Sequence, residues 1–377
     1  MNLTAFKSGQ WVKHSDNRSF SPAKINHTWS IDDDQVNYLL SRANLLLGEL
    51  NGFSKQIPDI DFFIRMHVFK EATTSSQIEG TQTNMAEAFQ KIEYISPERR
   101  DDWCEVQNYI NAMNFAISEL NNLPLCNRLL REAHKILMNN ARGESMNPGN
   151  FRTIQNWIGG SSLNDAIFVP PCHTEVVDLM SDLELFLNNN ELKIPTLIKI
   201  AIGHYQFETI HPFLDGNGRI GRLLITLYLV KENILTKPTL YLSDFFCNNR
   251  QLYYDNLRIV SFKDDMTQWL KFFLVGVIET SEKSISTFEK ILKIKTDIEQ
   301  NGITKLGKRV QIAQALLKYL FSQPIVDIND VMKQLNISNP TALKLVNEFI
   351  SLGILKDITG YKRNRSFVFD KYMRLFG

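Results

Sequence analysis

The sequence predicts a mostly α-helical protein with one small β-hairpin and a C-terminal domain of its own. Apolar residues recur every three or four positions through most of the chain, which is the period of an amphipathic helix. The segment 151–171 lacks that period. Residues 305–377 differ in charge, because they hold 12 Lys and Arg against 5 Asp and Glu while the whole chain carries a formal charge of only +1.

The helical period divides into separate segments along the chain. Leu39, Ala43 and Leu47 show it near the N-terminus, since residues four apart share one helix face. Similar spacing recurs near residues 129–137, 176–187, 197–207, 223–230 and 269–278. We therefore expect a helical N-terminal region over residues 1–95 and a helical core over residues 96–290.

Residues 151–171 predict a β-hairpin. Two β-prone pieces, 153–158 and 166–169, flank a run of Gly, Ser, Asn and Asp that suits a turn. The pattern alone leaves open whether the hairpin is a structural surface element or part of a functional site.

Residues 305–377 predict a winged helix-turn-helix. Three helices are expected first, over residues 310–321, 328–335 and 339–352. Two short strands then flank a basic turn at 361–365. Lys344 is the one cation between residues 339 and 349, which is few for a helix that contacts DNA phosphates. DNA binding and protein docking both stay open for this domain.

The composition excludes several classes of protein. A net charge near zero gives no overall field that recruits nucleic acid or a membrane. The four cysteines are scattered without a CxxC pair, which argues against a disulfide framework and a structural zinc site. No signal peptide is predicted, and the apolar run at 223–230 is too short to span a bilayer. We expect a soluble, cytoplasmic protein.

Residues 211–222, with the sequence HPFLDGNGRIGR, combine the groups needed for chemistry on phosphates. A glycine-rich turn that opens a helix exposes successive backbone N–H groups and forms an anion site. Asp215 supplies an oxygen ligand of the kind Mg²⁺ prefers, and His211 can exchange a proton near neutral pH. Arg219 and Arg222 share a helix face and can clamp a polyphosphate. These groups together indicate nucleotidyl or phosphoryl transfer.

Two other interpretations of this run are weaker. Gly216, Gly218 and Gly221 fit the dinucleotide fingerprint GxGxxG. That fingerprint needs a preceding strand and an acidic residue about 20 positions later, whereas the preceding segment has a helical period and the acid is absent. The second interpretation is a metal site formed by His204, His211 and Asp215. The apolar helical context of His204 instead predicts a buried, hydrogen-bonded histidine.

The run resembles the signature His-x-Phe-x-Asp/Glu-Gly/Ala-Asn-Gly/Lys-Arg-x-x-Arg of the Fic family, whose members mostly transfer AMP from ATP to protein hydroxyls. Upstream, residues 75–80 (SSQIEG) resemble the inhibitory pattern Ser/Thr-x-x-x-Glu-Gly/Asn of that family. The resemblance extends over most of residues 22–276 and includes, in the expected order, 148–152 (PGNFR), 155–160 (QNWIGG) and 168–171 (FVPP). It implies a Fic-type helical core that carries its inhibitory helix on the N-terminal side.

The resemblance implies a role for each residue of the run. His211 is expected to deprotonate the target hydroxyl, and Asp215 to hold the Mg²⁺ that bridges the α- and β-phosphates of ATP. Arg219 is expected to neutralise the developing pyrophosphate, and Arg222 to bind the γ-phosphate. The amides of Gly216, Asn217 and Gly218, with the Asn217 side chain, are expected to cradle the α- and β-phosphates. Ile220 and Gly221 complete the expected ATP-binding set.

Glu79 is the expected inhibitory residue. Ser75 and Glu79 lie four positions apart and hence on one helical face. If that helix packs against the catalytic helix, Glu79 can pair with Arg222 and deny it to the γ-phosphate of ATP. The alternative is a solvated glutamate near a helix end, with Gly80 as the residue that terminates the helix.

The hairpin resembles the flap that Fic proteins hold over the active site, where it pairs with an extended segment of the target. Ile154, Ile167 and Phe168 are the residues of the flap that we expect to face the pocket, and Trp157 is assigned to the core. Tyr253 falls where family members line the nucleotide pocket, and an ordinary core tyrosine is the competing interpretation.

The expected activity is transfer of AMP from ATP to Tyr, Thr or Ser hydroxyls of a target protein, self-modification included. Alternatives within the family use another nucleotide, or remove AMP with Glu79 assisting a water molecule. An alternative of another class is a DNA-binding regulator whose core only senses nucleotide. DNA, through the C-terminal domain, and a second copy of the chain in a homodimer are the further partners considered.

Overall fold

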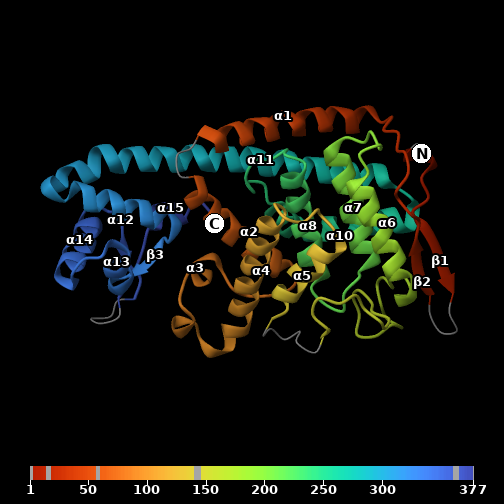
Figure 1. The fold of residues 1–377 in the computed structure, drawn as a ribbon, viewed down its shortest axis with the longest axis horizontal. Coiled ribbons are helices and arrows are strands. Elements are labelled where there is room, and N and C mark those ends of the chain that lie inside the picture. The colour runs from red at the N-terminus through yellow and green to blue at the C-terminus, as the bar shows by residue number, and fades with distance from the viewer. Residues whose placement is uncertain (1–2, 14–17, 57–59, 140–145, 360–364, 377) are drawn as a thin grey trace.

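The computed structural model describes residues 3–13, 18–56, 60–139, 146–359 and 365–376. Helices make up most of this part of the chain, and the strands are few and short (Figure 1). The predicted fold class is therefore confirmed.

The N-terminal segment contains a β-hairpin that the sequence analysis did not predict. A 3₁₀ turn, η1 (Leu3–Ala5), precedes two antiparallel strands, β1 (Gly9–Lys13) and β2 (Arg18–Pro22). Trp11 lies opposite Phe20 in this pair. The side chain of Asp264 ties the hairpin to the core, because it accepts hydrogen bonds from the backbone N–H (2.8 Å) and the hydroxyl (2.7 Å) of Ser8.

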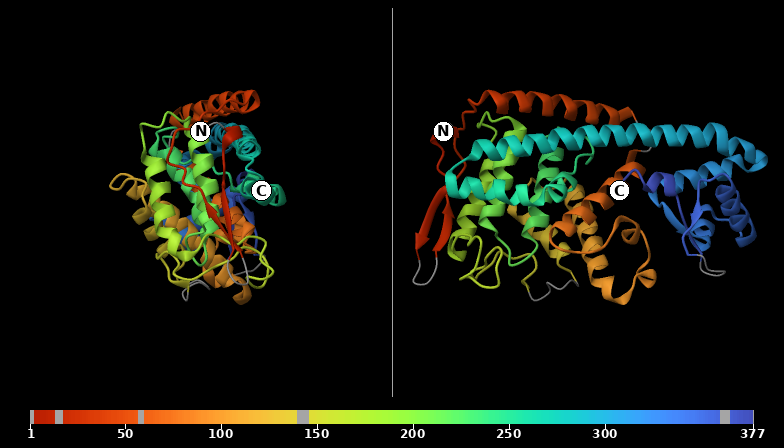
Figure 2. Two further views of the ribbon diagram at one scale, coloured as in Figure 1. Left: turned by 90° about the vertical axis from the view of Figure 1, so that its right-hand side faces the viewer. Right: turned by 180° about the vertical axis from the view of Figure 1, so that it is seen from behind.

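Two long helices run side by side along one face of the molecule (Figures 1 and 2). They are α1 (Asp34–Gln56) and α11 (Met266–Asp297). Beneath them lie the helices of the core, joined by loops and 3₁₀ turns. These elements are α2 (Ile60–Ile78), α3 (Met85–Ala88), η2 (Ile92–Tyr94), η3 (Pro97–Arg99), α4 (Arg100–Glu119), α5 (Asn127–Leu137), η5 (His173–Glu175), α6 (Val176–Asn188), α7 (Thr196–Ile210), α8 (Asn217–Lys231), α9 (Ser243–Asn248) and α10 (Arg250–Lys263).

Helices α7 and α8 form the centre of the core. Nearly all their side chains are buried, which fits helices that are apolar on every side. They pack against each other, and the loop 211–216 joins the end of α7 to the start of α8. Helices α2 and α4 also pack against α8. The run 211–222 therefore lies at the buried centre of the core.

Residues 151–171 pair less than predicted. The expected strands at 153–158 and 166–169 reduce to one antiparallel bridge between Ile158 and Phe168. The Ile158 N–H donates to the Phe168 carbonyl (2.8 Å), and the Phe168 N–H returns to the Ile158 carbonyl (3.1 Å). The chain does reverse direction here, but the prediction of two regular strands is wrong.

The C-terminal region follows a π-helical turn, η6 (Ile298–Gly302), and a 3₁₀ segment, η7 (Ile303–Arg309). Its elements are α12 (Val310–Ser322), β3 (Ile325–Asp327), α13 (Ile328–Leu335), α14 (Asn339–Ser351), β4 (Lys356–Asp357), β5 (Ser366–Val368) and α15 (Asp370–Met373). The three strands form an antiparallel sheet in the order β3-β5-β4. This order agrees with the expected helices, although the winged helix-turn-helix assignment stays a prediction. Of the basic turn, 361–364 lies outside the described residues.

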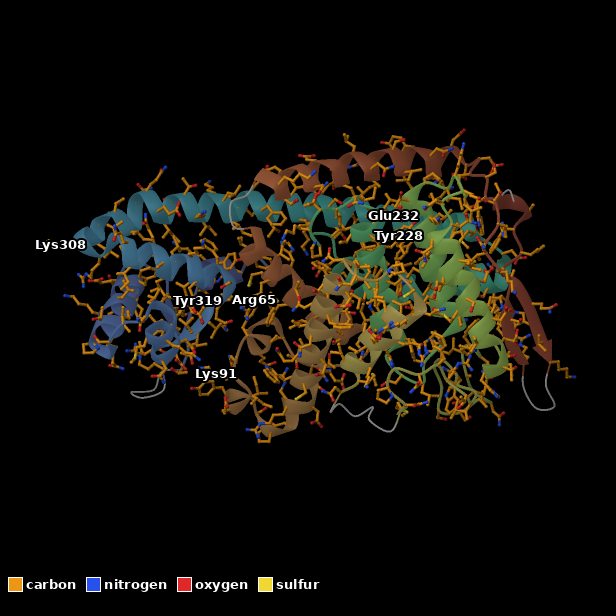
Figure 3. The ribbon with its side chains drawn as sticks, in the orientation of Figure 1. Arg65, Lys91, Tyr228, Glu232, Lys308 and Tyr319 are labelled. Carbon is orange, nitrogen blue, oxygen red and sulfur yellow. The ribbon has the colours of Figure 1, made fainter. Side chains whose placement is uncertain are left out.

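The C-terminal region packs back onto helix α2 and the segment that follows it. The Lys91 ammonium contacts Asp327 (2.7 Å) and Asp330 (2.8 Å) at the start of α13. Arg65 of α2 donates to the side chain of Gln323 (3.2 Å), whose amide donates in turn to the carbonyl of Phe89 (3.2 Å). Figure 3 shows Arg65 and Lys91 on the side of the core that faces Tyr319 of α12. The two regions are thus joined by polar contacts as well as by the chain.

Among the described residues, no helix combines the length and the apolar character that crossing a membrane requires. The four cysteines are all free thiols.

Replacing Lys91 with Met should weaken this contact between the regions. The Lys91 side chain is about half exposed, so the loss of its ion pairs should cost about 0.5–1 kcal/mol of unfolding free energy at low salt. The loss should shrink in about 1 M NaCl, because salt screens exposed charges. Urea unfolding at both salt concentrations measures it, with Lys344→Met on the exposed face of α14 as the control. A salt-independent loss would contradict the electrostatic account.

Candidate active site

The loop between α7 and α8 begins and ends with left-handed backbone. His211, directly after α7, has φ 50°, and Gly216, directly before α8, has φ 75°. Only glycine adopts this conformation without cost, so a histidine there must be held by its surroundings. The backbone N–H of His211 donates to the Phe207 carbonyl (3.0 Å).

Asn217 closes this loop with its side chain. The amide oxygen accepts the N–H of Phe213 (2.8 Å), and the amide nitrogen donates to the carbonyl of the same residue (2.8 Å). Asn217 is almost fully buried. In this structure the amide of Asn217 therefore stabilises the loop, and the role of that side chain in cradling phosphate stays a prediction. Its backbone N–H still belongs to the first turn of α8.

Arg152 holds the loop from the other side. Its guanidinium is buried, and it donates to the carbonyls of His211 (2.9 Å), Pro171 (2.6 Å) and Ile210 (3.3 Å). Burial lowers the pKa of Arg152 to about 10, so it remains charged at neutral pH. Asn156 adds a hydrogen bond to the same carbonyl of His211 (3.2 Å). The sequence marked both residues as part of a matching motif but gave neither a role.

His134 of α5 supports the loop from below. Its ring stacks on Phe213 with 3.8 Å between the ring centroids. The Gly149 N–H donates to Nδ1 (2.9 Å), so the proton is on Nε2, which donates to the Asp215 carbonyl (2.9 Å). Burial lowers the pKa of His134 to about 4, so the ring is neutral at physiological pH. No pattern in the sequence pointed to this residue.

His211 presents one ring nitrogen as a base. Nδ1 lies 3.3 Å from the carbonyl of Glu208, and a carbonyl can only accept, so Nδ1 carries the proton. Nε2 then has a free lone pair. Burial lowers the pKa of His211 to about 4, which keeps the ring neutral and ready to accept a proton at neutral pH.

The start of α8 faces the carboxylate of Glu79. A Cβ placed on Gly218 would lie 2.3 Å from Glu79 Oε1, so the carboxylate rests directly on the first turn of the helix. Helix N-termini attract anions, because their N–H groups have no partner within the helix. Glu79 thus occupies the position that the sequence assigned to phosphate.

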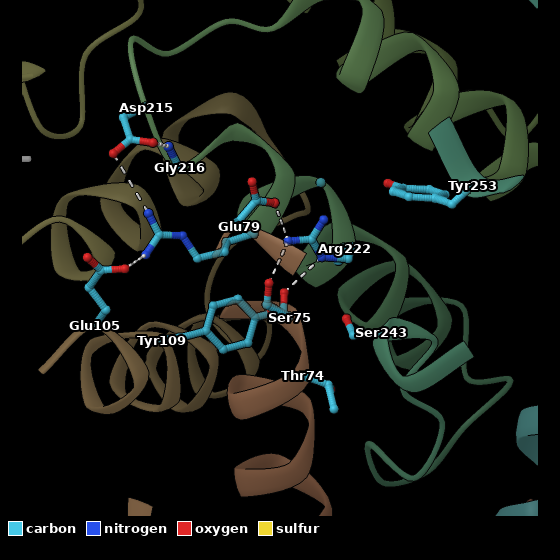
Figure 4. Close-up of polar contacts among 12 residues, drawn as sticks. Thr74, Ser75, Glu79, Glu105, Tyr109, Asp215, Gly216, Arg222, Ser243 and Tyr253 are labelled. Carbon is cyan, nitrogen blue, oxygen red and sulfur yellow. Dashed lines mark hydrogen bonds and ion pairs between the residues drawn. The ribbon is translucent and has the colours of Figure 1, made fainter. Parts of the chain in front are cut away.

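Arg222 is the cation at the centre of the site (Figure 4). Its Nη2 donates to Glu79 Oε1 (2.6 Å) and to the carbonyl of Ser75 (3.0 Å), while Nε donates to the Ser75 hydroxyl (2.8 Å). The guanidinium is almost fully buried. The structure therefore brings together the three residues that the sequence analysis linked.

The carboxylate of Glu79 is about one-third exposed, although it pairs with a buried arginine. Burial acts to raise the pKa of Glu79, but the charge and hydrogen bond of Arg222 outweigh it, so the pKa lies below its usual value. Glu79 follows the last residue of α2, and Gly80 has φ 107°. The alternative role of Gly80 as a helix terminator is therefore also correct.

Arg219 lies between helix α4 and Asp215. Its guanidinium contacts Glu105 of α4 (3.2 Å) and lies 3.9 Å from Asp215. Arg219 is buried, and its Nε has no hydrogen-bond partner among the described residues. Glu105 was missed by the sequence analysis, because it lies far from the motif in sequence and within an ordinary helix.

Two further buried carboxyl groups lie near Arg222. Glu71, one turn before Ser75 on α2, accepts hydrogen bonds from the hydroxyls of Tyr109 and Ser243. Glu208 rests on α8, where a Cβ at Gly221 would lie 2.1 Å from Oε1. Burial raises the pKa of Glu208 to about 8, so this group is mostly protonated at neutral pH. Glu79 is therefore the carboxylate that supplies the negative charge in direct contact with Arg222.

Asp215 can serve as a metal ligand. Half of its side chain is exposed, and Oδ1 accepts the N–H of Gly216 (2.6 Å). Among the described residues, no group of three or more His, Cys, Asp and Glu side chains is arranged to hold a metal. Mg²⁺ commonly binds through one or two carboxylates together with substrate phosphates, so a single exposed aspartate beside an anion site fits it.

Tyr253 does not line the site. It is 1% exposed, its hydroxyl contacts His204 Nε2 (2.8 Å), and its ring stacks on Phe246. The nucleotide-lining prediction for Tyr253 is therefore wrong, and the core interpretation is correct. His204 also contacts the Gly221 carbonyl (2.9 Å), which confirms it as a buried, hydrogen-bonded histidine. The neighbouring Tyr254 is partly exposed, and burial, together with the charge of Glu79, raises its pKa.

The flap residues divide into two groups. Ile154 and Ile167 are 60% and 54% exposed, and their position facing the pocket stays a prediction. Phe168 is 7% exposed and packs against the aromatic rings of the N-terminal hairpin, so its assignment to the pocket is wrong. Trp157 is 40% exposed, so its assignment to the core is also wrong.

Comparison with known families supports the resemblance noted in the sequence. Residues 38–118 match the family model described as Fic/DOC family N-terminal, and residues 124–229 match the model described as Fic/DOC family. The chain belongs to the Fic/DOC family.

Relatives of known name match over part of their length. Protein adenylyltransferase fic-1 of Caenorhabditis elegans is 30% identical over 177 residues, which cover 46% of this chain and 31% of that protein. Protein adenylyltransferase Fic of Aedes aegypti is 28% identical over 141 residues, covering 37% of this chain and 25% of that protein. The chain thus spans about a third or less of each of these two relatives.

Solved structures share the fold. A Fic family protein from Desulfovibrio desulfuricans G20 superposes with a TM-score of 0.59 at 21% identity, covering 92% of this chain and 98% of that one. Fic-1 from C. elegans superposes with a TM-score of 0.54 at 22% identity, covering 69% and 73% of the two chains.

The neutral histidines of the site predict a loss of stability in acid. Their folded pKa values lie near 4, below the unfolded value of about 6.5, so the folded state binds fewer protons. Stability is full above pH 6.5 and falls as the pH drops towards 4. His134→Gln keeps a hydrogen-bond acceptor and donor but does not titrate. It should therefore reduce the slope of the unfolding free energy against pH by about 1.4 kcal/mol per pH unit. Urea unfolding between these pH values measures the slope, and an unchanged slope would contradict the assignment.

Proposed function

We propose that this chain transfers AMP from ATP to hydroxyl groups of a target protein and that Glu79 inhibits the transfer. The observation that carries the proposal is the geometry around α8. A buried arginine, Arg222, lies beside the N-terminal turn of the helix, and the loop that precedes this turn carries a neutral histidine, His211, with an unprotonated ring nitrogen. The names of the relatives support the same activity.

In the proposed complex the triphosphate of ATP lies along the start of α8. The γ-phosphate takes the place of the Glu79 carboxylate on Arg222, and the N–H groups of the first turn bind the α- and β-phosphates. Arg219 lies close enough to Asp215 to face the same phosphates. Such catalysis consists mainly of positioning and charge stabilisation.

The chemical step balances as a substitution at the α-phosphorus. The oxygen of the target hydroxyl forms a bond to this phosphorus, and the bond to the bridging oxygen of the β-phosphate breaks. His211 Nε2 takes the hydroxyl proton, and pyrophosphate leaves with the electron pair. Asp215 would hold a Mg²⁺ ion, which stabilises negative charge on the phosphates when bound.

Glu79 would inhibit because its carboxylate occupies the position that a phosphate group of ATP takes in the proposed complex. Its carboxylate already neutralises Arg222 and rests on Gly218. In this conformation, the negative charge of Glu79 would repel the triphosphate both at Arg222 and at the first turn of α8. Because the Ser75 contacts to Arg222 do not depend on Glu79, the arginine stays in place when the carboxylate leaves.

Glu79→Gly should raise AMP incorporation by at least about tenfold, since a charge-assisted contact of this kind contributes about 1.5–3 kcal/mol. Ser75→Ala, which removes a neutral contact, should have a smaller effect. Incorporation of label from α-labelled ATP into protein measures the transfer. His211→Ala in the Glu79→Gly background should abolish the signal. Equal labelling by the parent chain and Glu79→Gly would remove the claim of inhibition.

Asp215→Asn in the Glu79→Gly background should weaken the dependence on metal. The variant keeps the shape of the side chain but loses its charge, so the Mg²⁺ concentration for half-maximal labelling should rise about tenfold or more. A chelator should stop labelling in both proteins. Asp265→Asn, which alters an exposed helix cap at the start of α11, is the control. An unchanged Mg²⁺ titration would exclude Asp215 as a ligand.

A further inference from the structure

A cavity of about 50 Å³ lies where helices α2, α9 and α11 meet. It is lined by His67 and Lys70 of α2, Asp244 of α9, Lys283 of α11 and Tyr241 just before α9. A buried water molecule needs about 10–15 Å³, so this space holds about three to five atoms of water size. That is the size of a small polyatomic anion. The proposed AMP transfer uses none of these residues.

Two buried polar atoms in the lining of this cavity lack a partner. Among the described residues, neither Nε2 of His67 nor the hydroxyl of Tyr241 has a hydrogen-bond partner. The two residues are only 8% and 5% exposed. Unpaired polar groups at this depth cost free energy, and native proteins rarely keep them without a bound water or ligand. The cavity therefore offers two hydrogen bonds that the protein itself does not use.

The His67 ring is held in place by aromatic neighbours. Its centroid lies 4.9 Å from that of Phe288 on α11 and 5.2 Å from that of Phe376. Burial lowers the pKa of His67 to about 4, so the ring is neutral at physiological pH. A neutral ring nitrogen can donate or accept one hydrogen bond, according to the tautomer.

The charges around the cavity favour an anion. The Lys70 ammonium lies 3.1 Å from Asp244, and Lys283 contacts the other oxygen of the same carboxylate. Burial acts to raise the pKa of Asp244, but the two lysines outweigh it, so the carboxylate is charged. Asp244 is the one acidic side chain among the described residues that line the cavity. Two cations against one anion leave a net positive charge, and each ammonium carries three N–H donors.

Helix α2 connects this cavity with the site around Arg222. Counting back from Glu79, Ser75, Glu71 and His67 follow at intervals of four residues, so neighbouring members of the series lie on one side of the helix. Ser75 and Glu79 contact Arg222 (Figure 4). Glu71 accepts a hydrogen bond from Ser243, two residues after Tyr241. A ligand that held α2 at His67 would thus hold the helix that leads to Glu79.

We propose that this cavity binds a small oxyanion, inorganic phosphate or an ion of the same size and charge, and that the bound anion fastens α2 to α9 and α11. The ammonium groups of Lys70 and Lys283 would bind oxygens of the anion, the Tyr241 hydroxyl would donate to another, and His67 Nε2 would complete the set. The anion would therefore stabilise the position of the helix that carries Ser75 and leads to Glu79.

Equilibrium dialysis of the full-length chain with labelled inorganic phosphate tests the site. Lys70→Met should raise the Kd about tenfold or more, because it removes a charge-assisted contact. Lys290→Met removes the same charge from an exposed position on α11 and should leave the Kd unchanged. No binding, or binding that Lys70→Met leaves unchanged because phosphate lies at the start of α8, would overturn the proposal.

Tyr241→Phe separates binding from structure. Its hydroxyl has no partner in the protein, so its removal should not lower the urea midpoint in the absence of phosphate. The Kd for phosphate should still rise about three- to tenfold, since the ligand loses one hydrogen bond. A lower midpoint together with an unchanged Kd would show that the hydroxyl has a structural role only, and would overturn its assignment to the site.

Hydrogen exchange tests the link to the end of α2. The amides of Glu79 and Gly80 donate to the carbonyls of Ser76 and Gln77. Saturating phosphate should slow their exchange about threefold or more in the parent chain and leave it unchanged in Lys70→Met at the same phosphate concentration. Phosphate also stabilises proteins without binding a site, so the difference between the two chains decides. Equal slowing in both would overturn the link. Neither test uses a nucleotide, so the site stands or falls independently of AMP transfer.

Discussion

The site depends on the need of a buried guanidinium for an anionic partner. Arg222 is almost fully buried, and leaving such a charge unpaired costs several kcal/mol. Ser75 supplies two neutral acceptors, and Glu79 supplies the negative charge in direct contact. A phosphate group could replace Glu79 without leaving the arginine unpaired. One carboxylate can therefore hold the proposed enzyme inactive while the rest of the site keeps its geometry.

The same loop links the base, the helix N-terminus and the flap. Asn217 closes the loop on Phe213, His134 supports it from below, and Arg152 joins it to the flap through the carbonyl of His211. The strained backbone of His211 is thereby fixed by contacts on several sides. Since Arg152 belongs to the flap segment and touches the catalytic loop, it fixes the position of the flap relative to the proposed base.

Much of the fold and the site could be predicted from the sequence, because both rest on local patterns. The helical period places most helices, and the spacing of Ser75 and Glu79 predicts that they share a helix face. The pairing of Glu79 with Arg222 was expected from the resemblance to the Fic family. Contacts between distant segments could not be predicted in the same way. The hairpin of Trp11 and Phe20 is short and joins the fold through the flap. Tyr253 and Phe168 are aromatic residues whose burial depends on such partners, so pattern alone could not separate core from pocket.

The most direct test of the central claim is a crystal structure of Glu79→Gly with Mg²⁺ and a non-hydrolysable analogue of ATP. The account predicts that the γ-phosphate contacts Arg222, that the α- and β-phosphates lie on the first turn of α8, and that the α-phosphorus faces His211 Nε2 with room for an attacking oxygen between them. A triphosphate bound elsewhere, or bound here with Arg222 still paired only to protein, would contradict it.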